Sequence, residues 1–382
     1  MPPLKISLQA RDLHARATVV DLHAHPSLNV SLWQHKFASR HRSTGAWNPF
    51  TMRTDLPKLR DGNVRVLLSA VYLPERRLLT DCWALKVAKC FASPKVQRLF
   101  QGSPFDRTLE VIARFEAEVA RSTINGHEVA RVVRSRQELE TALAEGKLAI
   151  LHTLEGAHSL GGSVLNARTF FDRGVCLLTL AHFYANEFVH PVEAIPPDQK
   201  IPGCFEEPKD LTKGLTPLGE ELVEACVEMG MLVDLTHCTP PARRRAFEIV
   251  RRRRPLLFTH VGVASLNPQP MNPTDAEIRQ IAHTGGVVGI ILMNYWLTPV
   301  KIKQGLHYVV ETARRIRDQG GIETVALGTD FDGFTDPPDD VKDMADLPNI
   351  TEALLRGGFS EADIQLILGG NALRVLRQGW GR

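Results

Sequence analysis

The chain has 382 residues, of which 43% are hydrophobic, and its formal net charge is only +3. This length and apolar content can bury a large core, and the near-balanced charge gives no strong attraction to nucleic acid. The N-terminus lacks the apolar core of a signal peptide, and no apolar stretch is long enough to span a bilayer. We therefore expect a soluble, cytoplasmic protein with neither nucleic acid nor a membrane as a partner.

Along the chain, short apolar runs alternate with longer segments of helical period. The runs with strand character are Thr18–Leu22, Val64–Leu73, Leu148–Leu154, Val175–Ala181, Met231–Thr236, Leu256–Thr259, Val287–Met293 and Val325–Gly328. The helical segments are Phe105–Thr123, Arg136–Ala144, Pro217–Met229, Pro241–Val250, Thr274–His283 and His307–Gln319. Eight strands that alternate with helices indicate an α/β architecture and favour a closed (β/α)8 barrel, the TIM barrel. An open doubly wound sheet is the main alternative, but no Gly-x-Gly-x-x-Gly sequence follows the first strand.

Two connections are longer than usual, although we expect one barrel domain over residues 1–382. The segment 74–104 follows the second strand and should contain helices of its own, around Asp81–Ala92. The segment 183–216 follows the fourth strand and is rich in proline, glycine and charge. Long loops are often lids or binding loops, and both segments leave from the active-site face of the predicted barrel.

The remaining local features indicate neither a nucleic-acid surface nor a disulfide framework. Two arginine clusters, 243–245 and 251–254, flank a predicted helix, and we interpret them as a solvated helix face. The six cysteines include no Cys-x-x-Cys pair. Cys176 and Cys226 lie in apolar runs and are predicted to be buried, reduced thiols, which suits a reducing compartment.

The first strand ends in two histidines, His23 and His25, that are spaced one residue apart. Residues i and i+2 of a β-strand point to the same side, so the two imidazoles can converge on one point. Two converging neutral imidazoles suit a divalent transition metal. Alone, this pattern is a weak signal because it also occurs in loops and surface strands.

Five other strands also end in a residue type that binds metals. The third ends in Glu155 and the eighth in Asp330, while the intervening ends carry His182, His237 and His260. In a barrel these strand ends surround one opening, so the side chains would face a common cavity. A single strand-terminal histidine is more often structural. Six strands that all end this way predict a shared metal site.

The donor set indicates a role for several of these residues. Imidazole and carboxylate ligands suit Zn²⁺, with Mn²⁺, Fe²⁺ and Co²⁺ left open, and they outnumber the ligands of one tetrahedral ion. We therefore expect two divalent ions with a shared hydroxide, bridged by Glu155 because a carboxylate offers two oxygens. Asp330 suits a general base that takes a proton from the attacking water, with Asp332 as its near competitor. His182, if it is not a ligand, could stabilise the developing oxyanion.

Most of these residues lie in longer motifs, and further motifs accompany them along the chain. The motifs are Leu154–Leu160, Leu178–His182 with Asn186, Leu215–Gly219, Val233–His237, Phe258–His260, Gly285–Gly289, Gly328–Gly333 and Gly370–Val375. Together they resemble the membrane dipeptidase (renal dipeptidase, peptidase M19) branch of the amidohydrolase superfamily, from about Val19 to Leu376.

The resemblance implies a β/α barrel with two zinc ions that hydrolyses dipeptides, often with a D-residue or dehydro-residue at the C-terminal position. It also implies the ligands: one ion would bind the first-strand pair and Asp330, the other His237 and His260, and Glu155 would bridge them. His182 would contact the substrate at the scissile carbonyl, and Asn186 would be a further substrate-binding residue.

Two positions depart from the family pattern. The first-strand motif of the family is usually His-x-Asp, whereas here it is His23-Ala24-His25. The change removes one negative charge from the ligand set, which could alter metal preference and the acidity of bound water. The family also carries an arginine, four residues after the sixth-strand histidine, that is thought to hold the substrate's C-terminal carboxylate. Ala264 stands at that position and cannot replace the arginine fork.

These observations leave three hypotheses. The first is a binuclear hydrolase that attacks an amide bond, most simply in a dipeptide. The second is the same machinery acting on an N-acyl amino acid, a lactone or an ester, which Ala264 keeps open. The third is a non-catalytic barrel used as a binding component. Loss of the main ligands would have indicated such a protein, but all of them are present. The family resemblance alone suggests a homodimer.

Overall fold

The computed structural model describes residues 4–44, 48, 50–91, 93–124, 126–299 and 305–382. Its main sheet has nine parallel strands, and eight of them, paired with one another in the order of the sequence, form the barrel. These strands are β1 (Val19–Ala24), β2 (Val64–Tyr72), β6 (Leu148–Glu155), β7 (Leu177–Thr179), β8 (Leu232–Asp234), β9 (Leu256–Val261), β10 (Val287–Ile290) and β11 (Val325–Leu327). All eight predicted strands are therefore confirmed. Almost all of their residues are buried, as the apolar runs indicated.

The sheet closes into a barrel at the carboxyl ends of its first and last strands. Ala24, at the end of β1, forms a parallel bridge with Phe331, which lies beyond the end of β11. The His25 N–H donates to the carbonyl of Phe331, and the Asp330 N–H donates to the carbonyl of His23, both at 2.8 Å. The fold is the predicted TIM barrel and not an open sheet. Its closing contacts lie at the end where active sites of this fold form.

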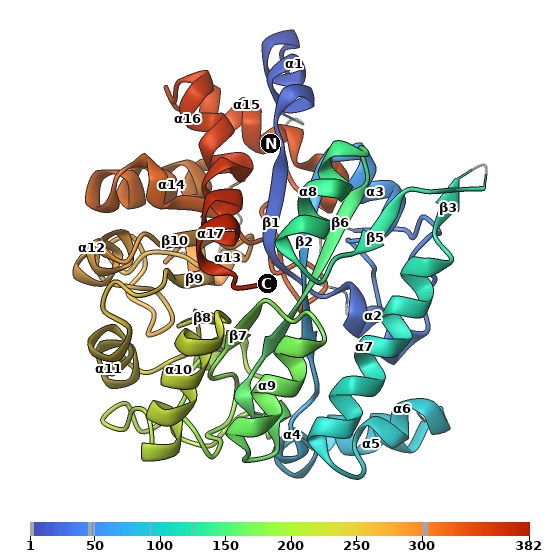
Figure 1. The fold of residues 1–382 in the computed structure, drawn as a ribbon, viewed down its shortest axis with the longest axis vertical. Coiled ribbons are helices and arrows are strands. Elements are labelled where there is room, and N and C mark those ends of the chain that lie inside the picture. Colours follow the sequence, from blue (N-terminus) through green and yellow to red (C-terminus); the bar gives the residue numbers. More distant parts are fainter. Residues whose placement is uncertain (1–3, 45–47, 49, 92, 125, 300–304) are drawn as a thin grey trace.

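Helices surround the barrel, as Figure 1 shows. Those outside the first long connection are α1 (Leu8–Arg16), α2 (Pro26–Trp33), α3 (Leu56–Asp61), α7 (Pro104–Ala120), α8 (Arg136–Ala144), α9 (Val164–Asp172), α10 (Pro217–Met229), α11 (Pro240–Val250), α12 (Asp275–His283), α13 (Asn294–Leu297), α14 (His307–Gly320), α15 (Pro348–Arg356), α16 (Glu361–Gln365) and α17 (Asn371–Gly379). The six predicted helices correspond to α7, α8, α10, α11, α12 and α14. The predicted capping box at the start of α12 is present, with Thr274 and Glu277 as its two members. None of the helices in the described ranges is long and apolar enough to cross a membrane.

The chain between α7 and α8 adds strands that the sequence did not indicate. β3 (Thr123–Ile124) and β4 (His127–Glu128) pair with each other as a short antiparallel ladder. β5 (Ala130–Val132) pairs with β6 as an additional parallel strand beside the barrel. Segments of two or three residues are too short to give a periodic pattern.

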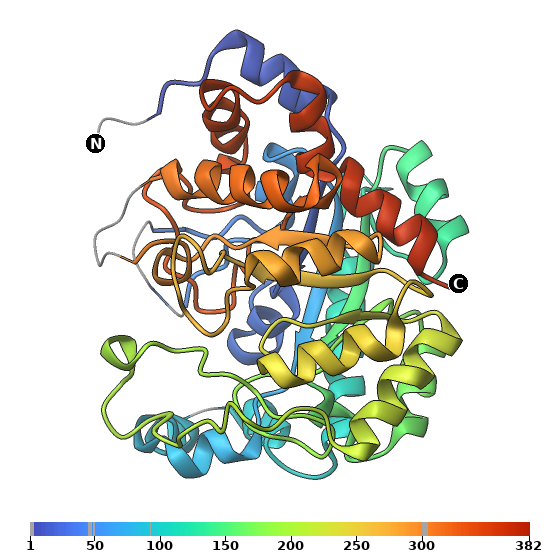
Figure 2. The same ribbon diagram turned by 90° about the vertical axis from the view of Figure 1, so that its left-hand side faces the viewer.

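Both long connections leave from the carboxyl ends of barrel strands. The one after β2 contains α4 (Arg76–Asp81), α5 (Trp83–Phe91) and α6 (Pro94–Leu99), which confirms that this segment is helical. Ala92, at the end of the helical segment predicted there, lies outside the described residues. The connection after β7 is mostly irregular. In Figure 2 this yellow-green loop lies next to the blue helices of the first connection, and a disulfide between Cys82 and Cys204 joins the two.

The disulfide is the one feature of the cysteines that the sequence did not reveal. Cys176 and Cys226 are buried and free, as predicted. Cys82 and Cys204 are 122 positions apart, and six cysteines allow many pairings, so no local spacing identifies the pair. Disulfides persist mainly in oxidising compartments, so this pair weighs against the expected reducing one. The cytoplasmic location stays a prediction.

One arginine of the basic clusters is buried, so the interpretation of a solvated face was wrong for that residue. Arg243, on α11, is 1% exposed. Its guanidinium donates to the carbonyls of Pro270 and Met271 at 2.8 and 2.9 Å and lies 3.4 Å from Glu277. Arg243 therefore anchors the loop after β9. By contrast, Arg245 is solvated and pairs with glutamates on the surface.

Candidate active site

Seven side chains gather where the barrel strands end, and they include every metal ligand predicted from the sequence. They are His23 (in β1), His25 (just after β1), Glu155 (the last residue of β6), His182 (after β7), His237 (after β8), His260 (in β9) and Asp330 (after β11). None is more than 6% exposed. The parallel pairing of neighbouring strands brings these ends together, as the barrel prediction required.

The carboxylate of Glu155 lies at the centre of this group. Its Oε1 is 3.2 Å from Nε2 of His23 and 3.5 Å from Nε2 of both His237 and His260. Its Oε2 is 3.5 Å from Nε2 of His25. Glu155 therefore belongs to two groups that could each hold an ion, one with His23 and His25 and one with His237 and His260.

The imidazoles of each group converge through their Nε2 atoms. Those of His23 and His25 are 3.1 Å apart, and Nε2 of His25 is 3.1 Å from Oδ1 of Asp330. Those of His237 and His260 are 3.3 Å apart. Nitrogen lone pairs repel at this range unless a proton or a cation lies between them. Converging imidazoles and carboxylates therefore fit divalent ions, which take these ligands.

Two of these residues have strained backbones. His237 has φ 67° and Asp330 has φ 57°, in the left-handed region that residues other than glycine rarely adopt. Such conformations cost about 1–3 kcal/mol each and persist where the surrounding structure enforces them, often at functional sites. Burial also raises the pKa of Asp330. A raised pKa favours uptake of a proton by this carboxyl group.

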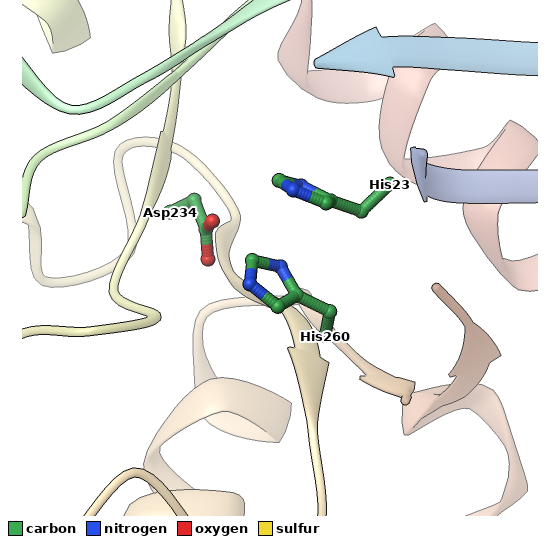
Figure 3. A group of neighbouring side chains, drawn as sticks. All are labelled: His23, Asp234 and His260. Carbon is green, nitrogen blue, oxygen red and sulfur yellow. The ribbon is translucent and has the colours of Figure 1, made fainter. Parts of the chain in front are cut away.

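A buried threonine and aspartate support two of the histidines. The Thr259 hydroxyl donates to Oδ2 of Asp234 at 2.7 Å and accepts from Nδ1 of His260 at 2.8 Å and of His23 at 3.3 Å. Figure 3 shows both imidazoles and the Asp234 carboxylate turned toward one another. The Asp234 carboxylate accepts hydrogen bonds from three threonines, Thr179, Thr236 and Thr259. We therefore assign Asp234 to ligand support, since Nδ1–H donation leaves each Nε2 free for an ion.

Burial sets the protonation of the centre. It lowers the pKa of His237 to about 4 and holds that of His260 well below its usual range. Burial alone would raise the pKa of Glu155, but the imidazoles of His182 and His23 outweigh it and hold that pKa well below the usual range. Neutral imidazoles at His237 and His260 beside an ionised Glu155 are the protonation states that metal binding needs.

His182 contacts a second carboxylate, which the sequence gave no reason to single out. Its Nδ1 lies 3.3 Å from Oε1 of Glu75, and its Nε2 lies 3.5 Å from Oε2 of Glu155. Glu75 is buried and also accepts hydrogen bonds from the Phe183 N–H at 3.1 Å and from the Tyr72 hydroxyl. Burial opposes a charge on His182, but the two carboxylates outweigh it and raise its pKa.

A cavity opens beside the group and is lined mainly by apolar and aromatic side chains. They include Leu28, Phe183, Ile195, Met293, Trp296 and Phe334. Within the part of the chain that the structure describes, no lysine or arginine lines it. Ala264, at the position of the family's arginine, is not among the lining residues, and its N–H bonds the Pro273 carbonyl at 3.0 Å.

Asn186 and Asp332 lie outside the central group. The Asn186 side chain bonds the backbone of its own loop, donating to the Leu180 carbonyl at 3.1 Å and accepting from two N–H groups. Its predicted contact with the substrate stays a prediction, and the bonds described here are structural. Asp332 accepts from the N–H groups of Arg53 and Thr54 at 2.6 and 3.1 Å. Its side chain therefore bonds the backbone of another loop and not the central group, as we expected of the weaker candidate for the general base.

The sequence model of the membrane dipeptidase family, peptidase family M19, matches residues 8–379. The chain belongs to this family. Dipeptidase tcpJ of Claviceps purpurea is 29% identical over 233 residues, which cover 61% of this chain and 51% of that protein. Dipeptidase 3 of Rattus norvegicus is 27% identical over 289 residues, which cover 72% of this chain and 53% of that protein. The chain thus spans about half the length of these curated relatives.

Solved structures share the fold over nearly the whole chain. Dipeptidase AC, a metallopeptidase of family M19, has a TM-score of 0.75 at 21% identity, covering 96% of this chain and 99% of that one. A metallopeptidase from Rhodobacter sphaeroides, solved with a phosphinate mimic of the dipeptide L-Ala-D-Ala, has a TM-score of 0.76 at 20% identity, covering 95% and 99%. Membership of a metallopeptidase family implies a divalent metal, for which the converging ligands described above are the candidate holders.

Proposed function

We propose that this protein is a dipeptidase that hydrolyses the amide bond of dipeptides with two divalent ions, zinc being the expected metal. The observation that carries the proposal is the position of Glu155 between two ligand groups, one with His23 and His25 and one with His237 and His260. Family membership supports the reaction class, and the dipeptide mimic bound to the Rhodobacter sphaeroides protein supports the substrate. The complete ligand set also argues against a non-catalytic barrel.

Each residue of the centre then has a role. One ion would be held by the first-strand histidines with Asp330, the other by His237 and His260, and Glu155 would contact both. When bound, two such ions acidify a shared water and polarise the scissile carbonyl. Asp330 would accept the proton of the attacking water and pass it to the leaving amine. His182, which lines the cavity beside Glu155, would bond the carbonyl oxygen as negative charge develops there.

The test is the metal content and turnover of the purified protein. We expect about two ions per chain after metal-replete expression. Chelation should abolish hydrolysis of L-Ala-D-Ala, and added zinc should restore it. Asp330→Asn should lose at least about 10³-fold in kcat, whereas Asp332→Asn, a change of the same chemistry in the loop, should lose far less. A metal content near zero would overturn the proposal.

The cavity favours a second candidate, in which the same centre cleaves an uncharged amide, ester or lactone. A free C-terminal carboxylate would find no arginine fork at Ala264 and neither lysine nor arginine among the described lining residues. Apolar side chains such as Phe183 and Trp296 suit an uncharged group beside the scissile bond instead.

A matched pair of substrates separates the two candidates. L-Ala-D-Ala and its C-terminal amide differ only in the terminal charge, and N-acyl amino acids, esters and lactones complete the panel. The dipeptidase proposal expects the larger kcat/KM for the free dipeptide. The second candidate expects the reverse, and then Ala264→Arg should shift the preference toward the free carboxylate. Turnover of esters or lactones with no dipeptide cleaved would decide for the second candidate.

A further inference from the structure

We propose that Glu75 is a positioning residue that fixes the ring of His182 so that its Nε2 faces the reaction cavity. The inference deepens the proposed function, on which its kinetic test rests. Glu75 is 7% exposed and lies at the N-cap of α4, the first helix of the connection after β2. It does not line the cavity, whereas His182 does. Glu75 therefore acts through His182 and not on a substrate.

The Glu75 carboxylate is held by three donors from two parts of the fold. Its Oε1 faces Nδ1 of His182 at 3.3 Å and the Phe183 N–H at 3.1 Å, both just after β7. Its Oε2 accepts from the hydroxyl of Tyr72, the last residue of β2. A buried carboxylate with several fixed donors keeps its position, and so can fix the group that donates to it.

Ring packing alone cannot orient His182. Its ring centroid lies 4.4 Å from that of Tyr72, 3.9 Å from that of Phe183 and 4.7 Å from that of His237. These contacts fix the plane of the imidazole. They do not distinguish it from the same ring turned by half a rotation, in which a carbon would replace each nitrogen. The acceptor at Glu75 makes that distinction, because only Nδ1–H can donate to it. Nε2 is then left on the side of Glu155 and the cavity.

The contacts also supply a matched pair of variants. Glu75→Leu removes the carboxylate that accepts from His182 and replaces it with a side chain of similar size. Glu75→Gln removes the charge but keeps the acceptor, because the Phe183 N–H donates to the same Oε1 as His182 and so requires an oxygen there. The glutamine NH₂ group then falls toward the Tyr72 hydroxyl, which can accept from it.

The measurement that does not depend on turnover is a ¹⁵N-histidine NMR spectrum of the zinc-loaded protein, in which His182→Asn assigns the His182 signals. We expect a hydrogen-bonded Nδ1–H proton in the wild type and in Glu75→Gln, and its loss in Glu75→Leu. Metal content should stay the same in all three. We also expect kcat to fall about 10–100-fold in Glu75→Leu with little change in KM, and clearly less in Glu75→Gln.

A Glu75→Leu variant that keeps the Nδ1–H signal and its kcat would overturn the proposal, even if its melting temperature falls, because the role would then be structural. If Glu75→Leu does not fold, Glu75→Asp withdraws the carboxylate by one methylene and should show the same loss of signal. A wild type that cleaves none of the substrates would refute the proposed function. The NMR comparison would still test the position of His182.

Discussion

At the scale of single residues, the centre depends on side chains placed behind the ligands. Asp21, in β1, accepts from the hydroxyl and the N–H of Thr329 at 2.7 and 2.8 Å, which ties the first strand to the segment that carries Asp330. Burial raises the pKa of Asp21 to about 6 even so. In the same way, the hydrogen bond between Thr259 and Asp234 ties β9 to β8 behind the ligands His23 and His260. Ligand geometry is thus set by buried hydrogen bonds that involve no ion.

Thr259→Val tests this support directly. The variant keeps the shape of the side chain but removes the hydroxyl that accepts from His23 and His260. We expect metal affinity, measured by competition with a chromophoric chelator, to fall about 10–100-fold. Thr179→Val is the control, because the Thr179 hydroxyl donates to the same Asp234 oxygen but, among the described residues, forms no hydrogen bond with a ligand histidine. Equal affinity in the two variants would contradict the role given to Thr259.

At the scale of elements, the two long connections form one covalently linked unit, and the second of them lines the cavity. The loop after β7 supplies Ala194 and Ile195 to the cavity lining. Its Phe205 packs on Phe183 with ring centroids 5.1 Å apart. The Cys82–Cys204 disulfide fastens this loop to the end of α4. The cavity wall is therefore held by a bond between segments that lie far apart in the sequence.

Removing this bond should loosen the wall and lower stability. Closing a loop of 122 positions restricts the unfolded chain, so the Cys82→Ser/Cys204→Ser variant should lose about 2–4 kcal/mol of unfolding free energy. We also expect a higher KM, since the loop contributes to the lining. Cys90→Ser, at an exposed and free cysteine, should change neither. A thiol titration of the denatured, unreduced protein should find four free thiols among its six cysteines. Six free thiols would show that the bond is absent.

At the scale of the whole molecule, the barrel and the ligand set could be predicted because both follow from local patterns. Each strand is an apolar run, six of the eight have a metal-binding residue at or just after their end, and parallel pairing brings such ends together whatever the details of packing. His23 and His25 show this most simply: alternation along the strand placed both imidazoles on one side, and their Nε2 atoms lie 3.1 Å apart.

The features that could not be predicted are contacts between distant segments without a motif. Glu75 is 107 positions from His182, in a connection whose path no periodicity defines. The disulfide joins the same two connections, and no sequence pattern predicted it either. Arg243 looked like part of a charged run, but its position on α11 turns it toward the loop after β9. In each case the tertiary structure decides the role, and the residue type alone is compatible with an ordinary surface position.

The first and last strands of the barrel meet at the candidate metal centre, and this fixes when its ligand set can form during folding. His25 and Asp330, whose side chains touch, are 305 positions apart. Contacts this distant in sequence form late, because the chain must close a long loop before it gains from them. A nascent chain that has not yet delivered its last strand lacks Asp330 altogether. In the proposed enzyme, capture of the full metal complement would therefore report the completion of folding, because the ligand set is complete only when the last strand is in place.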